Sequence, residues 1–325
     1  MVPDNALVER FRADLDALIE PGERIGIAVS GGPDSLALLM LAAAARPDDI
    51  EVATVDHGLR VGSREEAEMV AGICERLGVP HAILAIEWDL PPSSAIQEQA
   101  RAVRYGALSQ WAREAQLGAL VTAHHLDDQA ETLVMRLNRG SGVRGLAGMR
   151  RRSGVPGDKD LPLLRPLLGW RRSELERICT DGRVSPTTDP SNADERHERV
   201  RVRQALRDGD WLDPEALAKS AANLAAADEA LEWATEREWS EAVEVTDGRI
   251  VYRASTAPIE IIRRVVARAI AELGTEGASD ELRGRELDRL IADLQQCNTT
   301  TLRGVLCTGG LDWTFTTAPP RSGLS

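Results

Sequence analysis

The sequence predicts an α/β fold, in which a parallel sheet with helices on both faces is followed by a helical linker and a small α+β domain. Three observations support this. Short β-rich runs alternate with helix-period segments through the first half of the chain, as in βαβ units. Several of these runs end in clusters of polar residues. An Ala-rich helical segment then precedes a last part with mixed strand and helix signals.

The first half supplies the elements of the sheet in alternating order. Strands are expected at Ile25–Val29, Ile50–Val55, His81–Ile86 and Leu120–Ala123, and helices at about 34–45, 64–77, 96–116 and 127–139. Open parallel sheets bind ligands at the carboxyl ends of their strands. The polar clusters that follow three of these strands, at Ser30–Ser35, Asp56-His57 and His124–Asp128, are therefore expected to form one site.

The second half contains fewer strand signals. Residues 140–162 are rich in Gly and Arg and predict a loop, and helices are expected at about 170–180 and 193–206. We expect a catalytic domain over 1–212, a linker helix within 213–245 and an α+β domain over 246–325. In that last domain we expect a strand at Arg249–Arg253, helices at 259–273 and 281–294, and a hairpin of Leu302–Thr308 and Leu311–Thr316 joined by Gly309-Gly310.

Composition excludes several classes of protein. The 325 residues are 43% hydrophobic, so a buried core can form. The longest apolar run, Leu36–Ala45, is too short to span a bilayer. The charged amino terminus does not resemble a secretory signal. We therefore expect a cytoplasmic protein with no membrane partner. The four cysteines show no paired spacing, which argues against a zinc or iron–sulfur site and against a disulfide framework.

The net charge of −13 hides a basic stretch. Residues 136–207 carry sixteen Arg and one Lys against nine acids, a local charge of +8. Phosphate binding needs local positive charge, so this stretch is a candidate track for RNA. A solvated basic face is the alternative, and composition leaves both open.

The segment Ser30-Gly31-Gly32-Pro33-Asp34-Ser35 has the chemistry of a phosphate-binding loop. Its glycines let the backbone approach phosphate oxygens, and the following helix offers free N–H groups. Ser30 and Ser35 add hydroxyl donors, and Asp34 fits beside phosphates if it holds Mg²⁺. There is no Gly-Lys-Ser/Thr, so this is not a Walker A loop. A glycine turn with an Asp/Ser helix cap is the alternative.

A second signal is the helix that begins near Asp127. Asp128 and Glu131 are three residues apart and share a face, so they can bind one cation, either Mg²⁺ or an ammonium group. His124 closes the preceding strand. Zinc is disfavoured because no third His or Cys ligand lies nearby. Helix caps with solvated acids are the alternative.

Together these motifs resemble those of the tRNA(Ile)-lysidine synthetases, members of the N-type ATP pyrophosphatase or PP-loop superfamily. Ser30–Ser35 is similar to the SGGxDS pyrophosphate loop, and His125–Thr132 to H-x-x-D-D-Q-x-E-T. Further matches are Asp56-His57-Gly58-Leu59-Arg60, Arg101–Tyr105, Arg139–Met149, Leu164–Leu168 and Asp189-Pro190-Ser191-Asn192. The resemblance covers about 20–210. Beyond it only the general layout matches.

The resemblance implies an adenine nucleotide alpha hydrolase-like, Rossmann-like fold that uses ATP and Mg²⁺. It implies lysine addition to the wobble cytidine of tRNA(Ile) with a CAU anticodon, through an adenylated cytidine. Asp56 and His57 would lie beside ATP, and Arg104 would contact the transferring phosphate or the activated base. Asp128 and Glu131 would bind free L-lysine, and His124 would assist proton transfer. A substrate loop would include Arg139, Gly140, Gly142 and Gly145.

The chain departs from the family pattern in one segment. Arg199-Val200-Arg201-Val202-Arg203 stands where the family shows R-N-x-x-R, and Glu198 replaces an aromatic residue. Arg199, Arg201 and Arg203 are candidates for tRNA contact, with local packing as the alternative. The carboxyl-terminal domain is expected to contact tRNA, and a homodimer is possible. The rival functions are a tRNA thiolase of the same superfamily and a non-catalytic nucleotide-binding module.

Overall fold

The computed structural model describes residues 2–58, 62–86, 88, 96–187, 196, 198–209, 211–253, 256–274 and 284–319. The chain divides into two compact units, residues 1–225 and 226–325. The division falls inside the long helix α9 (Pro214–Ala242). None of the described helices combines the length and the apolar character that crossing a bilayer requires.

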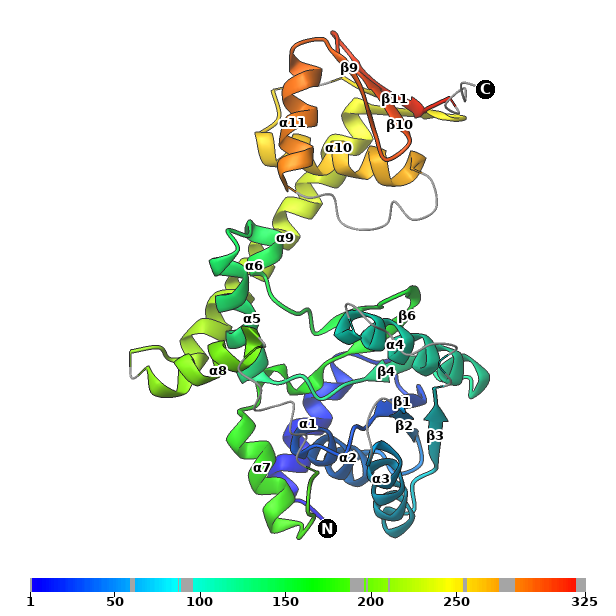
Figure 1. The fold of residues 1–325 in the computed structure, drawn as a ribbon, viewed down its shortest axis with the longest axis vertical. Coiled ribbons are helices and arrows are strands. Elements are labelled where there is room, and N and C mark those ends of the chain that lie inside the picture. Colours follow the sequence, from blue (N-terminus) through cyan, green and yellow to red (C-terminus); the bar gives the residue numbers. More distant parts are fainter. Residues whose placement is uncertain are drawn as a thin grey trace. The chain divides into compact units, whose positions relative to one another are not determined.

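The first unit is built on a six-stranded sheet (Figure 1). Its strands are β1 (Ile25–Ala28), β2 (Ile50–Asp56), β3 (His81–Ala85), β4 (Ala119–Val121), β5 (Arg152–Val155) and β6 (Asp158–Leu164), in the order β3-β2-β1-β4-β6-β5. All neighbouring pairs are parallel except β5 and β6. The predicted α/β fold with its parallel sheet is confirmed.

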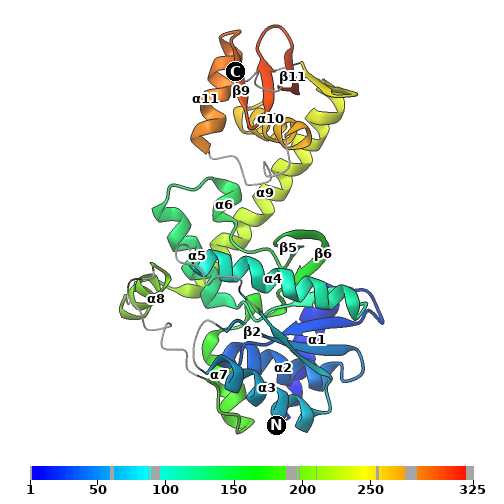
Figure 2. The same cartoon turned by 45° about the vertical axis from the view of Figure 1, so that its right-hand side comes forward.

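Helices cover both faces of this sheet because alternate strand residues face opposite sides. On one face, Ile25 and Ile27 pack with α1 (Asn5–Asp16), α2 (Pro33–Ala45), α3 (Ser63–Leu77), the 3-10 turn η1 (Pro166–Gly169) and α7 (Arg172–Asp181). On the other face lies α4 (Ile96–Glu114), whose Trp111 ring passes so close to Gly26 that a Cβ there would sit 2.7 Å from it. Figure 2 shows α4 on the side of the sheet opposite α2 and α3.

One expectation for this unit was wrong, and one helix was not predicted. Residues 140–162 are not a loop, since they contain the short helix α6 (Val143–Leu146), the strand β5 and most of β6. Leu163 is buried and pairs with Leu120 of β4. The charged start of β6, Asp158-Lys159-Asp160, hides the apolar alternation that would have predicted it. The helix α1 was also not expected, although it buries Val8, Phe11 and Leu15 at helical spacing.

Two further helices complete the part of this unit that carries the site. They are α5 (Leu126–Asn138), which begins directly after β4, and α8 (Glu198–Asp208), which lies against α5. α5 starts near the predicted residue 127. The predicted helix at 193–206 overlaps α8, and residues 193–195 and 197 lie outside the described residues.

The second unit is a small α+β domain, as predicted. Its antiparallel sheet has the order β7-β8-β11-β10-β9, formed by β7 (Val243–Thr246), β8 (Arg249–Tyr252), β9 (Thr299–Leu302), β10 (Val305–Thr308) and β11 (Trp313–Thr317). One face packs on α10 (Ile259–Leu273) and α11 (Gly284–Gln295). The expected single strand Leu302–Thr308 was wrong, because the chain turns back at Arg303, where φ is positive, and Leu302 pairs with Val305.

Candidate active site

The site lies at the carboxyl ends of three neighbouring parallel strands. β1 pairs with β2 on one side and with β4 on the other. The chain order reverses between β1 and β4, which makes this edge the switch point where open α/β sheets bind ligands. The polar clusters after β1, β2 and β4 therefore stand at one edge of the sheet, as the sequence predicted.

The loop after β1 has the shape of an anion cradle. Gly31 has a φ of +83°, and a Cβ there would lie 3.1 Å from Thr187 Oγ1. The Thr187 amide donates to the Gly31 carbonyl at 3.0 Å, so residue 187 holds the loop. Gly32 precedes α2 with no side-chain cap, and Pro33 is its first residue. The free N–H groups of that first turn are available to phosphate oxygens.

The two serines of this loop differ in their surroundings. Ser35 is buried, and its hydroxyl donates to the Gly32 carbonyl at 3.0 Å and accepts from the Ser30 amide at 3.2 Å. Ser30 is exposed. Ser35 thus shapes the loop from beneath, while the hydroxyl of Ser30 is the one that solvent or a ligand can reach. Contact of Ser35 with phosphate stays a prediction.

Asp34 joins the phosphate loop to the acidic helix through His125. His125 Nε2 lies 3.5 Å from Asp34 Oδ2 and 3.5 Å from Asp128 Oδ2, and its Nδ1 lies 3.7 Å from Asp127 Oδ2. His125 is buried, with 1% of the residue exposed. Burial alone would lower the pKa of His125, but the carboxylates of Asp34 and Asp128 raise it above its ordinary value. Three carboxylates therefore surround one imidazole ring.

His124 was the residue predicted to assist proton transfer, and a role for His125 was not predicted. His124 Nδ1 lies 2.9 Å from Thr122 Oγ1. Burial lowers the pKa of His124 to about 4, and the positive charges of Arg165 and Arg101 add to this against the opposing effect of Asp128. His124 is neutral near pH 7, so it can accept a proton, whereas the pKa of His125 is shifted upward by the acids around it. The signal for His125 was its place as the first residue of the H-x-x-D-D motif.

The two acids expected to bind an ammonium group have different partners. Asp128 Oδ2 accepts a hydrogen bond from the His125 amide at 3.1 Å. Burial alone would raise the pKa of Asp128, but His125 and Arg199 hold it below its ordinary value. Glu131 is 2% exposed and accepts from Arg203 at 2.6 and 3.2 Å. Arg199 Nε lies 3.1 Å from the same carboxylate. Asp128 is thus held in its ionised form, and both carboxylates are closely paired.

The three arginines expected to contact tRNA have different partners in the structure. Arg199 and Arg203 turn toward Glu131, and Arg199 also donates to Thr132 Oγ1 at 3.0 Å. Arg201 is exposed and donates to the Arg196 carbonyl at 3.1 Å. In this structure, local packing therefore accounts for Arg199 and Arg203. Their contact with tRNA stays a prediction.

The glycine-rich segment after α5 is held in place rather than loose. The Gln129 side chain bonds both backbone groups of Met149, at 2.7 and 2.8 Å. Gly148 has a φ of +69°, and a Cβ there would lie 2.5 Å from Gln129 Oε1. Of the residues predicted for a substrate loop, Arg139 pairs with Glu198, and Gly140, Gly142 and Gly145 flank or lie within α6. Their contact with a substrate stays a prediction.

The remaining predicted residues lie near this edge with varied partners. Asp56 accepts from the Ser63 hydroxyl and the Gly58 amide, and the His57 carbonyl accepts from Trp88 Nε1 at 2.7 Å. Arg104 is exposed on α4 and forms no ion pair among the described residues. Leu59, Arg60 and residues 189–192 lie outside the described residues.

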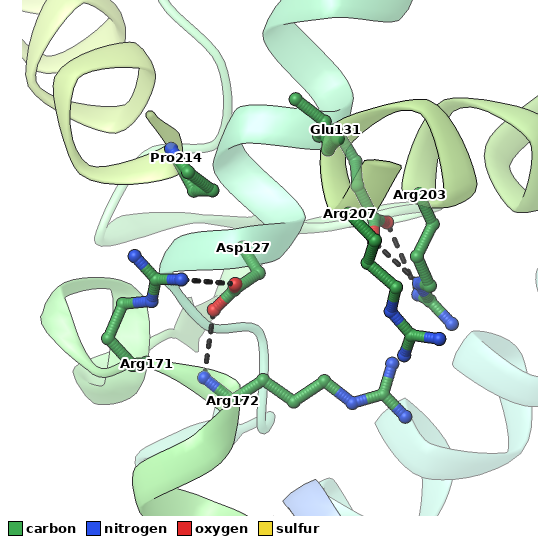
Figure 3. Close-up of a pocket in the computed structure, with 8 residues that line it drawn as sticks. Asp127, Glu131, Arg171, Arg172, Arg203, Arg207 and Pro214 are labelled. Carbon is green, nitrogen blue, oxygen red and sulfur yellow. Dashed lines mark hydrogen bonds and ion pairs between the residues drawn. The ribbon is translucent and has the colours of Figure 1, made fainter. Parts of the chain in front are cut away.

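A cavity of about 280 Å³ opens beside the acidic helix (Figure 3). It is lined by Asp127, Glu131, Arg171, Arg172, Arg203, Leu206, Arg207 and Pro214. Asp127 links it to the phosphate loop, because Asp127 contacts His125 and His125 contacts Asp34. This cavity was not predicted, because its arginines come from the start of α7 and from α8, which approach α5 only in the folded chain.

One oxygen atom of the site is suited to bind Mg²⁺. Asp34 Oδ1 is buried and has no hydrogen-bond partner, which suits a bound cation. The described residues include no cluster of three or more His, Cys, Asp or Glu with the geometry of a metal site. Mg²⁺ is commonly held by one or two carboxylates together with substrate phosphates, so a single carboxylate at the phosphate loop is consistent with it.

Comparison with known proteins identifies close relatives. A model of the PP-loop domain matches residues 6–209. A tRNA(Ile)-lysidine synthase from Novosphingobium aromaticivorans is 49% identical over 95% of this chain and 93% of its own. One from Zymomonas mobilis is 42% identical over 92% and 89%. Among solved structures, a tRNA thiolase from Methanococcus maripaludis is similar with a TM-score of 0.55 and 16% identity, over 70% of this chain and 80% of its own. That last likeness shows the fold alone.

Proposed function

The chain belongs to the tRNA(Ile)-lysidine synthase family of PP-loop proteins, and on that premise we propose that it is an ATP-dependent ligase that joins lysine to the wobble cytidine of tRNA(Ile) with a CAU anticodon. The observation that carries the proposal is the junction at His125. It binds Asp34 of the phosphate loop and Asp128 of the acidic helix within 3.5 Å each, so the loop suited to ATP and the helix suited to an amine form one site.

In the first step, the C2 oxygen of cytidine attacks the α-phosphate of ATP, and pyrophosphate leaves. The residues mainly position the phosphates and offset their charge. The amides of Gly31 and Gly32 and the hydroxyl of Ser30 would donate to the phosphates, and Arg101 and Arg165 add positive charge near His124. Asp34 would hold Mg²⁺, which supplies charge neutralisation when bound. Arg104 is the further candidate for the transferring phosphate.

In the second step, the ε-amine of lysine attacks C2. The new C2–N bond replaces the C2–O bond to the phosphate, and AMP leaves with that oxygen. Asp128, kept ionised by His125, would bind the ε-ammonium, and Glu131 would assist if Arg199 or Arg203 gives way. His124 would accept the proton that the amine loses, because its low pKa keeps it neutral and able to accept one.

The thiolase alternative needs a reactive thiolate, and the buried thiols do not offer one. Burial raises the pKa of Cys74 to about 12 and that of Cys179 to about 11. The Cys179 thiol lies beneath the phosphate loop and donates to the Pro33 carbonyl at 3.2 Å. We further propose that the enzyme acts in the cytoplasm and that its second unit contacts tRNA. We also propose that the protein forms a homodimer.

Incubation with ATP, labelled lysine and tRNA(Ile) bearing a CAU anticodon tests the function. Pyrophosphate release that depends on the tRNA, with label in the wobble nucleotide, is the expected result. The same tRNA with another wobble base is the control. Pyrophosphate release without lysine incorporation under any lysine concentration would overturn the ligase assignment, and no release at all would favour the non-catalytic module.

A further inference from the structure

We propose that Asp14, on the first helix α1, is a positioning residue for the active site and acts through the indole of Trp170. The hydrogen bond between these two side chains fixes where α5 begins, and with it the places of His125 and Asp128. The inference rests on the proposed function and deepens it, because it names a residue outside the site that sets the geometry of the reaction.

The indole of Trp170 is held by the polar face of α1. Trp170 is fully buried, and its Nε1 donates to Asp14 Oδ2 at 3.0 Å. The guanidinium of Arg10 lies 4.0 Å from the centre of the same ring and donates to the Gly169 carbonyl at 2.8 Å. Arg10 and Asp14 are four residues apart and therefore share a face of the helix. A buried indole N–H needs an acceptor, so loss of Asp14 would leave a donor unpaired in the core.

The carboxylate of Asp14 is itself fixed by a second arginine. Arg151, which directly precedes β5, donates to Asp14 Oδ1 at 2.8 Å and to the Asp14 carbonyl at 3.0 Å. The other carboxylate oxygen, Oδ2, accepts from Trp170. Because each oxygen has a partner, the direction of Oδ2 is set, and so is the place of the indole.

The backbone of the same tryptophan connects this contact to the acidic helix. The Trp170 carbonyl accepts from the amide of Leu126, the first residue of α5, at 2.9 Å. Two residues later in the chain, the Arg172 amide donates to Asp127 Oδ2 at 2.8 Å, an interaction drawn in Figure 3. The first N–H groups of a helix have no partner within the helix. These two hydrogen bonds therefore help to determine where the first turn of α5 lies.

The position of that turn sets the contacts that join the two halves of the site. His125 immediately precedes Leu126, and its Nε2 lies 3.5 Å from both Asp34 Oδ2 and Asp128 Oδ2. A misplacement of about 1 Å at reacting groups can lower a rate about a hundredfold. A shift of α5 away from the phosphate loop should therefore slow adenylation, while ATP still binds through the amides of the loop.

The test changes the acceptor of the indole N–H in two ways. Asp14→Leu removes it, whereas Asp14→Asn keeps an oxygen that can accept, and both remove the ion pair with Arg151. We expect Asp14→Leu to lower kcat for tRNA-dependent pyrophosphate release about tenfold or more, with the KM for ATP within about twofold of the unaltered value. Asp14→Asn should keep kcat within about threefold. Asp16→Leu, which breaks an ion pair of the same helix with Arg46, is the matched control and should leave kcat unchanged.

Hydrogen exchange supplies a readout that a general loss of stability would not reproduce. The Trp170 carbonyl protects the Leu126 amide. Exchange in the peptide that spans residues 124–130 should therefore speed up in Asp14→Leu relative to the other peptides of the first unit. The same peptide should keep its relative rate in Asp16→Leu. This comparison separates a local shift of α5 from uniform destabilisation.

Several results would overturn the proposal. One is a kcat for Asp14→Leu within about twofold of the unaltered value, and another is an unchanged relative exchange rate at Leu126. Equal losses for Asp14→Leu and Asp14→Asn would assign the effect to the ion pair with Arg151. If Asp14→Leu does not fold, Trp170→Phe takes its place, because it keeps an aromatic ring and loses the N–H. Failure of both variants to fold would mean that this hydrogen bond maintains the core and not the site.

Failure of the proposed function is distinct from these outcomes. The unaltered chain would then release no pyrophosphate with tRNA(Ile) bearing a CAU anticodon, so that no kcat could be compared. The positioning role fails only where the unaltered chain is active and the variants of Asp14 do not behave as described.

Discussion

Replacement of Glu131 with Met should destabilise the first unit. It should also distinguish two possible roles of this carboxylate, holding α8 in place and binding lysine. Glu131 is 2% exposed and is held by Arg203 and Arg199. Its removal leaves two guanidinium groups facing an apolar side chain at the junction of α5 and α8. Breaking a buried ion pair in this way costs about 3–5 kcal/mol.

The expected cost lies near the lower end of that range. The side chains of Arg203 and Arg199 retain 21% and 41% of their exposure, so water offsets part of the unpaired charge. Arg199 also keeps its bond to Thr132. We expect Glu131→Met to lower the free energy of unfolding by about 3 kcal/mol, and the double variant with Arg203→Met to recover most of this, because an apolar pair of similar volume replaces the ions.

Urea unfolding followed by tryptophan fluorescence measures the stability, since Trp111 and Trp170 are buried in this unit. A loss below 1 kcal/mol for Glu131→Met, or a double variant as unstable as the two single losses combined, would refute the reasoning. Lysine incorporation by the same variants then assigns the role. If Glu131 only holds α8, the double variant regains lysine use, and if Glu131 binds lysine it regains stability alone.

Three further predictions concern the rest of the site. Gly31→Ala should weaken ATP binding and lower stability by about 1–2 kcal/mol, because φ is +83° and Thr187 Oγ1 would lie 3.1 Å from the new Cβ; ATP affinity within a factor of two of the unaltered value would contradict it. Asp34→Asn should lower tRNA-dependent pyrophosphate release at least a hundredfold, because it removes a charge beside His125 and the phosphate loop, while circular dichroism stays unchanged; nearly full activity would exclude the role. Folding lowers the pKa of His124 from 6.5 to about 4, so the unfolded chain binds a proton there that the folded chain does not, and stability should fall by up to about 3 kcal/mol as the pH drops from 6.5 to 4. His124→Asn should therefore flatten the pH dependence of urea unfolding in that window, and an unchanged dependence would count against the burial of a neutral imidazole.

Sequence patterns predicted the central strands of the sheet because those strands are buried on both faces. Ile25–Ala28 and Ala119–Val121 are short apolar runs bounded by polar residues, and such runs are easily recognised. The edge strand β5 and its partner β6 escaped recognition because Gly154 and Asp158–Asp160 give no alternation. Their pairing depends on the register with β4, which is a long-range property.

Most residues of the site were predicted individually, but the contacts between them were not. The motifs indicated Asp34, Asp128 and Glu131 as site residues. No short-range pattern indicated that His125 would lie between Asp34 and Asp128, which are about ninety residues apart in the sequence. The arginines of α8 were assigned to RNA because a basic stretch suggests phosphate contact. Their inward turn toward Glu131 follows from the packing of α8 on α5, which the amino-acid pattern does not encode at short range.

The pairing of β1 with β4 determines how long one edge of β1 stays unpaired during synthesis. Ile25 pairs with Ala119, so one side of β1 has no partner until the later segment leaves the ribosome. At about 5–20 residues per second, that interval lasts roughly 5 to 20 s. For this time an apolar strand has an unpaired edge, to which other nascent chains can add. A stalled chain that ends before residue 119 should therefore depend on chaperones far more than one released just after residue 164.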